Sequence, residues 1–241
     1  MRLACLWIMC TRYTLHQPDA AVRAVAESLG VSLEFAEPFV PHYNLAPSVS
    51  APVILAEAGA PRLQFLRWGL LPPADRGRPV RRMLPNARAE SMTKLPAFRA
   101  AAERRCLVPA NGFYEFKDLG RRKEPYLFML ADEAPFAFAG LWEPPDGDLP
   151  GTFCILTTEP NSTVAPIHNR MPVVLTGGAM GRWLGEAPLS AAAMEELIRP
   201  APPEMLVPRR VDPFVNNSRH EGPQCLAEPP AAPPELGLAF D

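Results

Sequence analysis

Residues 106–116, with the sequence CLVPANGFYEF, carry the pattern that decides the fold. They are mostly apolar or aromatic, and Asn111-Gly112 is a dipeptide typical of a turn. Proline is disfavoured inside helices, so short apolar runs that contain or adjoin it favour strands. Runs of this kind recur along the chain, at residues 51–57, 62–68, 106–116, 125–131, 135–142, 152–158 and 171–176.

A helical pattern precedes these strands, in residues 18–30 (PDAAVRAVAESLG). Pro18 suits a first helical turn, apolar residues repeat at helical spacing, and Gly30 can end the helix. We therefore predict a helix here, with one apolar face packed on the strands.

Two further helical regions lie outside the strand runs. A short helix is expected at 96–105, and Ser190 is a suitable N-cap for a helix within 177–199. The proline-bracketed residues 41–48 are expected to form a loop. This order predicts a single mixed α+β domain with a β-rich, barrel-like core and peripheral helices.

Composition excludes several classes of protein. Of the 241 residues, 48% are hydrophobic and 21% charged, as in soluble globular proteins. No apolar run approaches the roughly 18 residues of a membrane span, and the apolar opening is shorter than a signal-peptide core. The five cysteines include no CxxC pair, which argues against a disulfide framework or a cysteine zinc site. We expect a cytoplasmic protein.

The four histidines have no metal-like spacing, so we predict neither a metal nor a cofactor. They are His16, His42, His168 and His220.

Charge is unevenly distributed. Residues 61–105 hold eleven Lys or Arg against three Asp or Glu, a net charge of +8 in a chain whose total is −2. A basic segment on an otherwise acidic protein attracts phosphates, although a solvated basic surface explains it equally well.

Two internal stretches offer proton-transfer chemistry. Glu115 shares a strand face with Phe113, and a carboxyl group desolvated by aromatic side chains gains a pKa suited to a proton donor. The alternative is a Glu115 that faces water from an edge strand. His168 lies two residues before Arg170 in a proline-bounded loop, where it serves either as a proton carrier or as a structural histidine.

Cys10 offers a nucleophile. An internal cysteine is usually a small core residue, whereas an N-terminal one carries both an α-amine and a thiol. The amine condenses with an aldehyde to give an imine, and the thiol then closes on the imine carbon to give a thiazolidine ring. The question is which kind of cysteine Cys10 is.

Taken together, seven stretches resemble the SOS-response-associated peptidase family. They are MCTRY, YNLAPS, WGLLPP, NARAES, RCLVPANGFYEF, PIHNRMPVVL and VNNSRHEGP, in this order. The resemblance implies a catalytic domain at residues 9–226. Residues 1–8 are then a mis-assigned or removed N-terminal extension. Residues 227–241, with four prolines and no basic residue, are expected to form a disordered tail.

The resemblance also implies a function. Members of the family crosslink covalently to abasic sites in single-stranded DNA through an N-terminal cysteine, here Cys10. The implied partner is thus single-stranded DNA bound by a monomer, with further abasic-site lyase and autopeptidase activity. By motif, the catalytic residues are Cys10, Asn86, Glu115 and His168, and the DNA-binding residues are Arg12, Pro47, Trp68, Arg88 and Arg170.

Three features depart from the family pattern. Thr11 replaces the usual glycine, and Phe116 replaces a tryptophan. Eight residues also precede Met9, so Cys10 has a free amine only if translation starts at Met9 or the protein removes residues 1–9 itself.

Two other functions fit the same residues. A thiol peptidase would use Cys10 and His168, with Glu115 or Asn86 orienting the imidazole. A non-covalent single-stranded DNA-binding module would use the basic segment, and its binding would fall steeply with salt.

Overall fold

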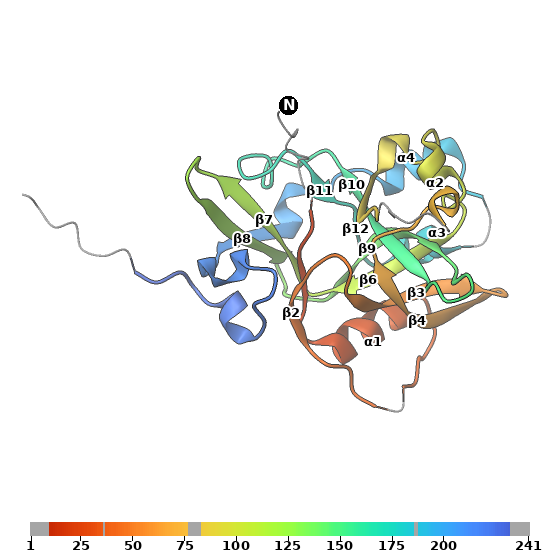
Figure 1. Ribbon diagram of the computed structural model, residues 1–241, viewed down its shortest axis with the longest axis horizontal. Helices are drawn as coiled ribbons and strands as arrows, with labels where there is room; N and C mark the ends of the chain where they lie inside the picture. The colour runs from red at the N-terminus through yellow and green to blue at the C-terminus, as the bar shows by residue number, and fades with distance from the viewer. Residues whose placement is uncertain (1–9, 36, 77–82, 186–187, 232–241) are drawn as a thin grey trace, which may run out of the picture.

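The computed structural model describes residues 10–35, 37–76, 83–185 and 188–231, and two β-sheets stand side by side in it (Figure 1). The extension expected at residues 1–8 lies outside the described residues, as does the part of the expected tail at 232–241. Within the described ranges, no helix combines the length and the apolar composition needed to cross a membrane.

The smaller sheet contains both the first strand, β1, and the last strand, β13. Its strands follow the order β13-β8-β7-β1-β2, and every pair is antiparallel. The first strand of the chain therefore lies between strands that follow it by many residues. The bounds are β1 Tyr13–Leu15, β2 His42–Leu45, β7 Gly112–Asp118, β8 Lys123–Leu130 and β13 Leu206–Arg210.

The larger sheet closes on itself. Its order is β11-β10-β4-β3-β6-β9-β12, β5 pairs with β10, and a further pairing of β10 with β9 completes a ring. The expectation of an α+β fold with a barrel-like core is confirmed. The bounds are β3 Ser50–Glu57, β4 Ala60–Trp68, β5 Asn86–Arg88, β6 Arg105–Ala110, β9 Phe136–Glu143, β10 Thr152–Thr158, β11 Met171–Pro172 and β12 Val174–Leu175.

Asn111 is where the chain passes from the ring to the smaller sheet. Its backbone N–H donates to the Thr14 carbonyl, and its side-chain oxygen accepts from the Gln17 backbone N–H. The single strand expected at 106–116 is therefore wrong, because these bonds turn the chain between β6 and β7. Gly112 follows because a Cβ there would lie 2.8 Å from the Phe128 carbonyl oxygen.

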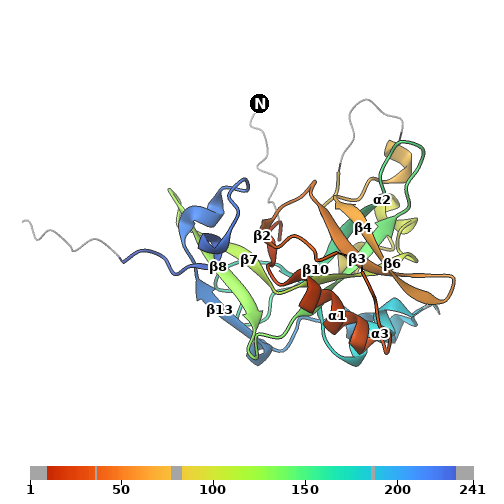
Figure 2. The ribbon, with the colours of Figure 1, turned by 90° about the horizontal axis from the view of Figure 1, so that it is seen from below.

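The helices lie outside the ring, as expected. Helices α1 and α3 lie next to each other (Figure 2), and both contact β6. The Ser190 side chain accepts a hydrogen bond from the Ala193 N–H, which confirms the predicted N-cap of α4. The α-helix expected at 96–105 is shorter than predicted. The bounds are α1 Pro18–Ser28, α2 Pro96–Arg99, α3 Gly178–Leu184 and α4 Ala191–Leu197, with 3-10 turns η1 Pro73–Asp75, η2 Ala89–Ser91, η3 Pro203–Met205, η4 Pro213–Asn216 and η5 Pro223–Leu226.

Other details also differ from the sequence prediction, which did not expect strands β1 and β5. The loop expected at 41–48 contains β2, which pairs with β1. The strand expected at 171–176 is split into β11 and β12, which pair with different partners. Strand β13 has no counterpart in the prediction, because four of its five residues are exposed and lack an apolar pattern.

The ring strands alternate between two cores. Inward side chains form the first core with Tyr13, Trp68 and Phe138, and outward side chains pack under α1 and α3 with Val22 and Trp183. Full burial of each large apolar side chain contributes about 1.5–3 kcal/mol. A smaller third core lies under the C-terminal segment, around Tyr114, Val211, Val215 and Cys225. The packing in these cores fixes the positions of the two sheets. The candidate site lies between those sheets.

Candidate active site

Cys10 lies just before β1 and is only 6% exposed. Its backbone φ is 30°, in the left-handed region that non-glycine residues rarely adopt. The Asn86 side-chain N–H donates to the Cys10 carbonyl oxygen at 3.1 Å. Asn86 begins β5, whose parallel pairing with β10 places it opposite Ile155. The sheet therefore fixes the amide that holds the Cys10 backbone.

Glu115 is a buried carboxyl group in the middle of β7, with 2% of the residue exposed. Phe113, two residues earlier, is buried on the same face and stacks on Phe128 at 5.0 Å between ring centroids. Burial raises the pKa of Glu115 to about 8, against a smaller opposing effect of a hydrogen bond with Cys10. Glu115 is thus mainly protonated at neutral pH and can act as a proton donor.

His168 lies in the loop between β10 and β11 and is held by the backbone of Arg170. Its Nδ1 is 3.0 Å from the Arg170 carbonyl oxygen and 3.2 Å from the Arg170 nitrogen. A single ring nitrogen cannot donate and accept at once, and the shorter contact favours Nδ1–H donating to the carbonyl. The Nε2 lone pair is then available to take a proton.

His168 Nδ1 also lies 3.5 Å from Glu115 Oε2, the distance of an ion pair. Burial, however, lowers the pKa of His168, only partly offset by its bond to Arg170, and it raises the pKa of Glu115. Both shifts favour the uncharged forms. We therefore describe the two groups at neutral pH as a neutral acid beside a neutral base.

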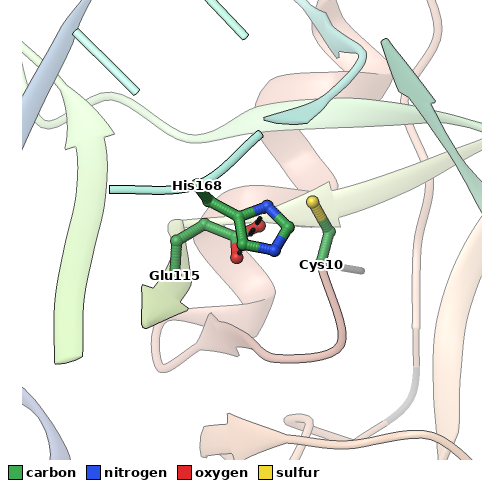
Figure 3. A group of neighbouring side chains, drawn as sticks. All are labelled: Cys10, Glu115 and His168. Carbon is green, nitrogen blue, oxygen red and sulfur yellow. Dashed lines mark ion pairs between the residues drawn. The ribbon is translucent and has the colours of Figure 1, made fainter. Parts of the chain in front are cut away.

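Cys10, Glu115 and His168 meet at one point, and their side chains point toward one another (Figure 3). One donor atom from each lies within 4.8 Å of the other two. Burial, and then interactions with Glu115, raise the pKa of the Cys10 thiol, whereas Arg170 lowers it. The resting thiol is protonated, and a base such as His168 is needed to activate it.

Arg170 and Arg88 flank this cluster. The Arg170 guanidinium makes two 2.9 Å bonds to the carboxylate of Glu90 and a 2.6 Å bond to the Thr157 carbonyl. Arg88 is exposed at the end of β5, two residues after Asn86. Strand pairing places Arg88 opposite Thr157, whose carbonyl accepts from Arg170, so the two arginines belong to the same part of the sheet.

Arg12 has a different setting. Its NH1 donates to the Asn44 side chain and to the Val215 carbonyl, each at 3.0 Å, and its guanidinium lies over the Phe116 ring. Asn44, a buried residue absent from the sequence prediction, donates to the carbonyls of Val215, Asn217 and His220. Arg12 and Asn44 thus fasten the segment after β13 beside the cluster.

Trp68, which the family resemblance includes among the DNA-binding residues, lies in the hydrophobic core. It is 1% exposed, its indole N–H donates to the Pro85 carbonyl at 2.8 Å, and it packs edge-on against Tyr13. Contact with a DNA base is therefore blocked, and we assign Trp68 to the core. Pro47, half-buried in the turn after β2, keeps a partly open face.

Sequence reasoning missed Glu90, Thr157 and Asn44. Glu90 and Asn44 stand inside the motifs NARAES and YNLAPS, where a polar residue among apolar ones is a usable signal. Thr157 carries no such signal, because it takes part through its backbone oxygen.

Known proteins are similar to this chain over most of its length. The abasic site processing proteins YoqW and YoaM of Bacillus subtilis are 33% and 34% identical to this chain over 224 residues, 90% of the chain and 99% and 97% of those proteins. The chicken abasic site processing protein HMCES is 32% identical over 234 residues, 82% of this chain and 68% of that protein.

Solved structures share the fold. A protein from Bordetella bronchiseptica superimposes with a TM-score of 0.67 at 25% identity, covering 84% of this chain and all of the other. One from Bacteroides thetaiotaomicron gives a TM-score of 0.66 at 29% identity, covering 75% and 82%. The model of the family described as SOS response associated peptidase (SRAP) matches residues 9–218, so this chain belongs to that family.

Proposed function

We propose that this protein captures abasic sites in single-stranded DNA by forming a covalent thiazolidine through Cys10. The observation that carries the proposal is the cluster of a thiol, a neutral carboxylic acid and an imidazole, beside an amide that holds the Cys10 backbone. The names of the similar proteins, which describe abasic site processing, support the same substrate.

The chemistry proceeds in two steps. The α-amine of Cys10 adds to the aldehyde carbon of the ring-opened deoxyribose, and loss of one water leaves an imine. The thiol sulfur then bonds to the imine carbon, and the thiol proton ends on the nitrogen. His168 takes and returns protons through Nε2, and Glu115, protonated at neutral pH, donates to the leaving oxygen.

The imine is a branch point. An imine makes the neighbouring C2′ proton more acidic, so its removal would eliminate the 3′ phosphate as a lyase does. Ring closure by sulfur removes the imine and prevents that loss. Asn86 favours closure because it fixes the backbone that carries the amine and the thiol.

This chemistry requires a free amine on Cys10. One route is translation from Met9 followed by methionine removal. The other is self-cleavage, in which Cys10 Sγ attacks the Met9 carbonyl, the peptide nitrogen leaves as the amine, and water hydrolyses the thioester. The left-handed φ of 30° at Cys10 supports the second route, because strain there is relieved when the peptide bond breaks.

DNA binding is assigned to Arg88, Arg170, Arg12 and Pro47. Arg88 is exposed, and Arg170 and Arg12 present part of their guanidinium groups beside the cluster. Arginine is suited to phosphate, and an abasic nucleotide has no base to unstack. The proposal includes a monomer that acts in the cytoplasm without a cofactor.

Intact mass spectrometry tests the proposal. The purified full-length protein is weighed before and after incubation with an abasic single-stranded oligonucleotide. We expect a protein that lacks residues 1–9 and then gains the mass of one oligonucleotide less one water. A chain started at Met9 is the matched sample. Absence of an adduct from that sample too, with the native fold intact, would overturn the proposal.

A peptidase that acts on other proteins is the second candidate, favoured by the closeness of Cys10 to His168. The α-amine distinguishes the two functions. Acetylation of the N-terminal amine would stop crosslinking, whereas it would leave thiol proteolysis unchanged. A purely non-covalent DNA-binding module would give no adduct that survives denaturation, and its binding would not respond to Cys10→Ser.

A further inference from the structure

Cys10, Glu115 and His168 come from three separate parts of the chain, so their spacing in the sequence gave no indication of a metal site. In the structure they converge, with one donor atom of each within 4.8 Å of the others. We propose that these three side chains bind a thiophilic divalent cation, Zn²⁺, and that the bound ion reversibly blocks the crosslinking reaction.

The spacing of the donors suits zinc. Zinc–ligand bonds of about 2.0–2.3 Å in a tetrahedral site place the donor atoms about 3.3–3.8 Å apart. The donors here need to approach by at most roughly 1–1.5 Å, which side-chain rotation can supply. Within the residues that the structure describes, no other group of three His, Cys, Asp or Glu side chains has this spacing.

The donor set also suits zinc. A thiolate, an imidazole nitrogen and a carboxylate oxygen are its common ligands, and three protein ligands leave one position open to water. Magnesium and calcium prefer oxygen ligands throughout, so the thiol and the imidazole select against them. The site is therefore that of a soft or borderline cation.

Two contacts already have the arrangement that a zinc ligand needs. His168 Nδ1 lies 3.0 Å from the Arg170 carbonyl, the kind of backbone contact that commonly orients the ring of a metal-binding histidine. Glu115 Oε1 is buried and has no hydrogen-bond partner among the described residues. An ion at this point would satisfy that oxygen.

Zinc and DNA would compete for the same atoms. Zinc takes the sulfur lone pair that closes the thiazolidine and the imidazole nitrogen that moves the protons. The inhibition rests on the proposed function, whereas the binding of zinc does not. Binding and inhibition must therefore be measured separately.

The binding test uses the chelator-treated full-length protein without DNA. Cobalt(II) is titrated first, since a cobalt–thiolate bond gives an intense near-ultraviolet absorption, and Zn²⁺ is then added to displace it. We expect one ion per chain. Cys10→Ser should remove the thiolate absorption, and Cys10→Ser and His168→Gln should each weaken zinc binding by at least about tenfold.

Cys225→Ser and His42→Asn are the matched controls. They change a cysteine and a histidine outside the cluster and should bind zinc like the unaltered protein. Circular dichroism identifies which variants keep the native fold, and those variants carry the comparison. Absence of cobalt and zinc binding, or equal binding by Cys10→Ser, would overturn the proposed site.

The inhibition test adds Zn²⁺ to the reaction with abasic single-stranded DNA. Adduct formation should fall in proportion to zinc occupancy and recover when a chelator is added. Zinc binding without inhibition would overturn the inhibitory role. The third outcome is a protein that binds zinc but forms no adduct even after the metal has been removed. That outcome would refute the proposed function and support the metal site.

Discussion

The carboxylate of Glu90 binds the guanidinium of Arg170 through two hydrogen bonds, each 2.9 Å long. The backbone of Arg170 in turn holds His168 Nδ1. One residue therefore connects a cationic side chain at the edge of the site with the imidazole inside it. Glu90 orients that residue from outside the cluster.

Glu90→Gln should slow crosslinking about fivefold. The change keeps the shape of the side chain but removes its charge, and a half-exposed ion pair of this kind contributes about 1 kcal/mol. Adduct formation at limiting DNA measures the effect. Glu196→Gln, which breaks the similar Arg182–Glu196 pair on the surface, is the control and should react normally. A faster Glu90→Gln would mean that Glu90 instead competes with phosphate for Arg170.

Stability should depend on pH through Glu115. Because burial raises its pKa to about 8, the folded protein favours the protonated carboxyl, whereas the unfolded chain ionises above about pH 4.3. The favourable effect is complete at acidic pH and is lost as the pH rises toward 8, by about 1.4 kcal/mol per pH unit. Urea unfolding near pH 5.5 and near pH 7.5 measures the effect. Between these pH values the free energy of unfolding should fall by about 2–3 kcal/mol more in the unaltered protein than in Glu115→Gln. Parallel pH profiles would show that Glu115 is ionised in the fold.

Asn44→Ala should destabilise the fold by about 2–3 kcal/mol, because it removes the three hydrogen bonds to the carbonyls of Val215, Asn217 and His220, each of which contributes about 1 kcal/mol. The free energy of unfolding in urea measures the loss. Asn216→Ala, which removes one exposed bond to the Lys123 carbonyl, should cost less than about 1 kcal/mol. Equal losses in the two variants would contradict the fastening role of Asn44.

Arg88→Ala should weaken single-stranded DNA binding and reduce the slope of log affinity against log salt by about one phosphate contact. The reason is that Arg88 is exposed beside Asn86. Fluorescence anisotropy at several salt concentrations measures both effects. Arg199→Ala, which changes an exposed arginine just after α4, should leave the slope unaltered. An unaltered slope in Arg88→Ala as well would remove Arg88 from the DNA path.

Trp68→Phe should lower stability and leave DNA affinity unchanged. The buried indole loses its bond to Pro85 and part of its packing, at a cost of about 2–4 kcal/mol. Thermal unfolding and anisotropy, measured on the same sample, separate the two effects. Weaker DNA binding without a lower melting temperature would return Trp68 to the DNA surface.

Local patterns in the sequence predicted most elements correctly. The helix at α1, the Ser190 cap and most ring strands follow from spacing and from turn residues, which act over short distances. Strands β1, β2, β5 and β13 were missed because they are short and their pairing partners, more than their own side chains, make them strands. The break at Asn111 depends on a contact with Thr14, far away in the sequence.

In the candidate site, too, the sequence predicted the residues but not the contacts between distant parts of the chain. Motif resemblance selected Cys10, Asn86, Glu115 and His168, but nothing in their spacing predicts that three of them meet within 4.8 Å. The motifs also do not predict which of these side chains are buried. The motif cannot tell a tryptophan that faces DNA from one that faces Tyr13, so Trp68 was misplaced.

The pairing of strand β1 determines when the site around Cys10 can form during synthesis of the chain. It pairs with β2 and β7, and Arg12 just before it is fastened to Val215 and Asn216. In a nascent chain, Cys10 therefore leaves the ribosome well before the segment around Val215, whose contacts with Arg12 help to enclose it. Such long-range pairing makes folding slow. The nucleophile of the proposed reaction is thus synthesised before the segments that enclose it, so an incomplete chain would lack the site that we propose acts on DNA.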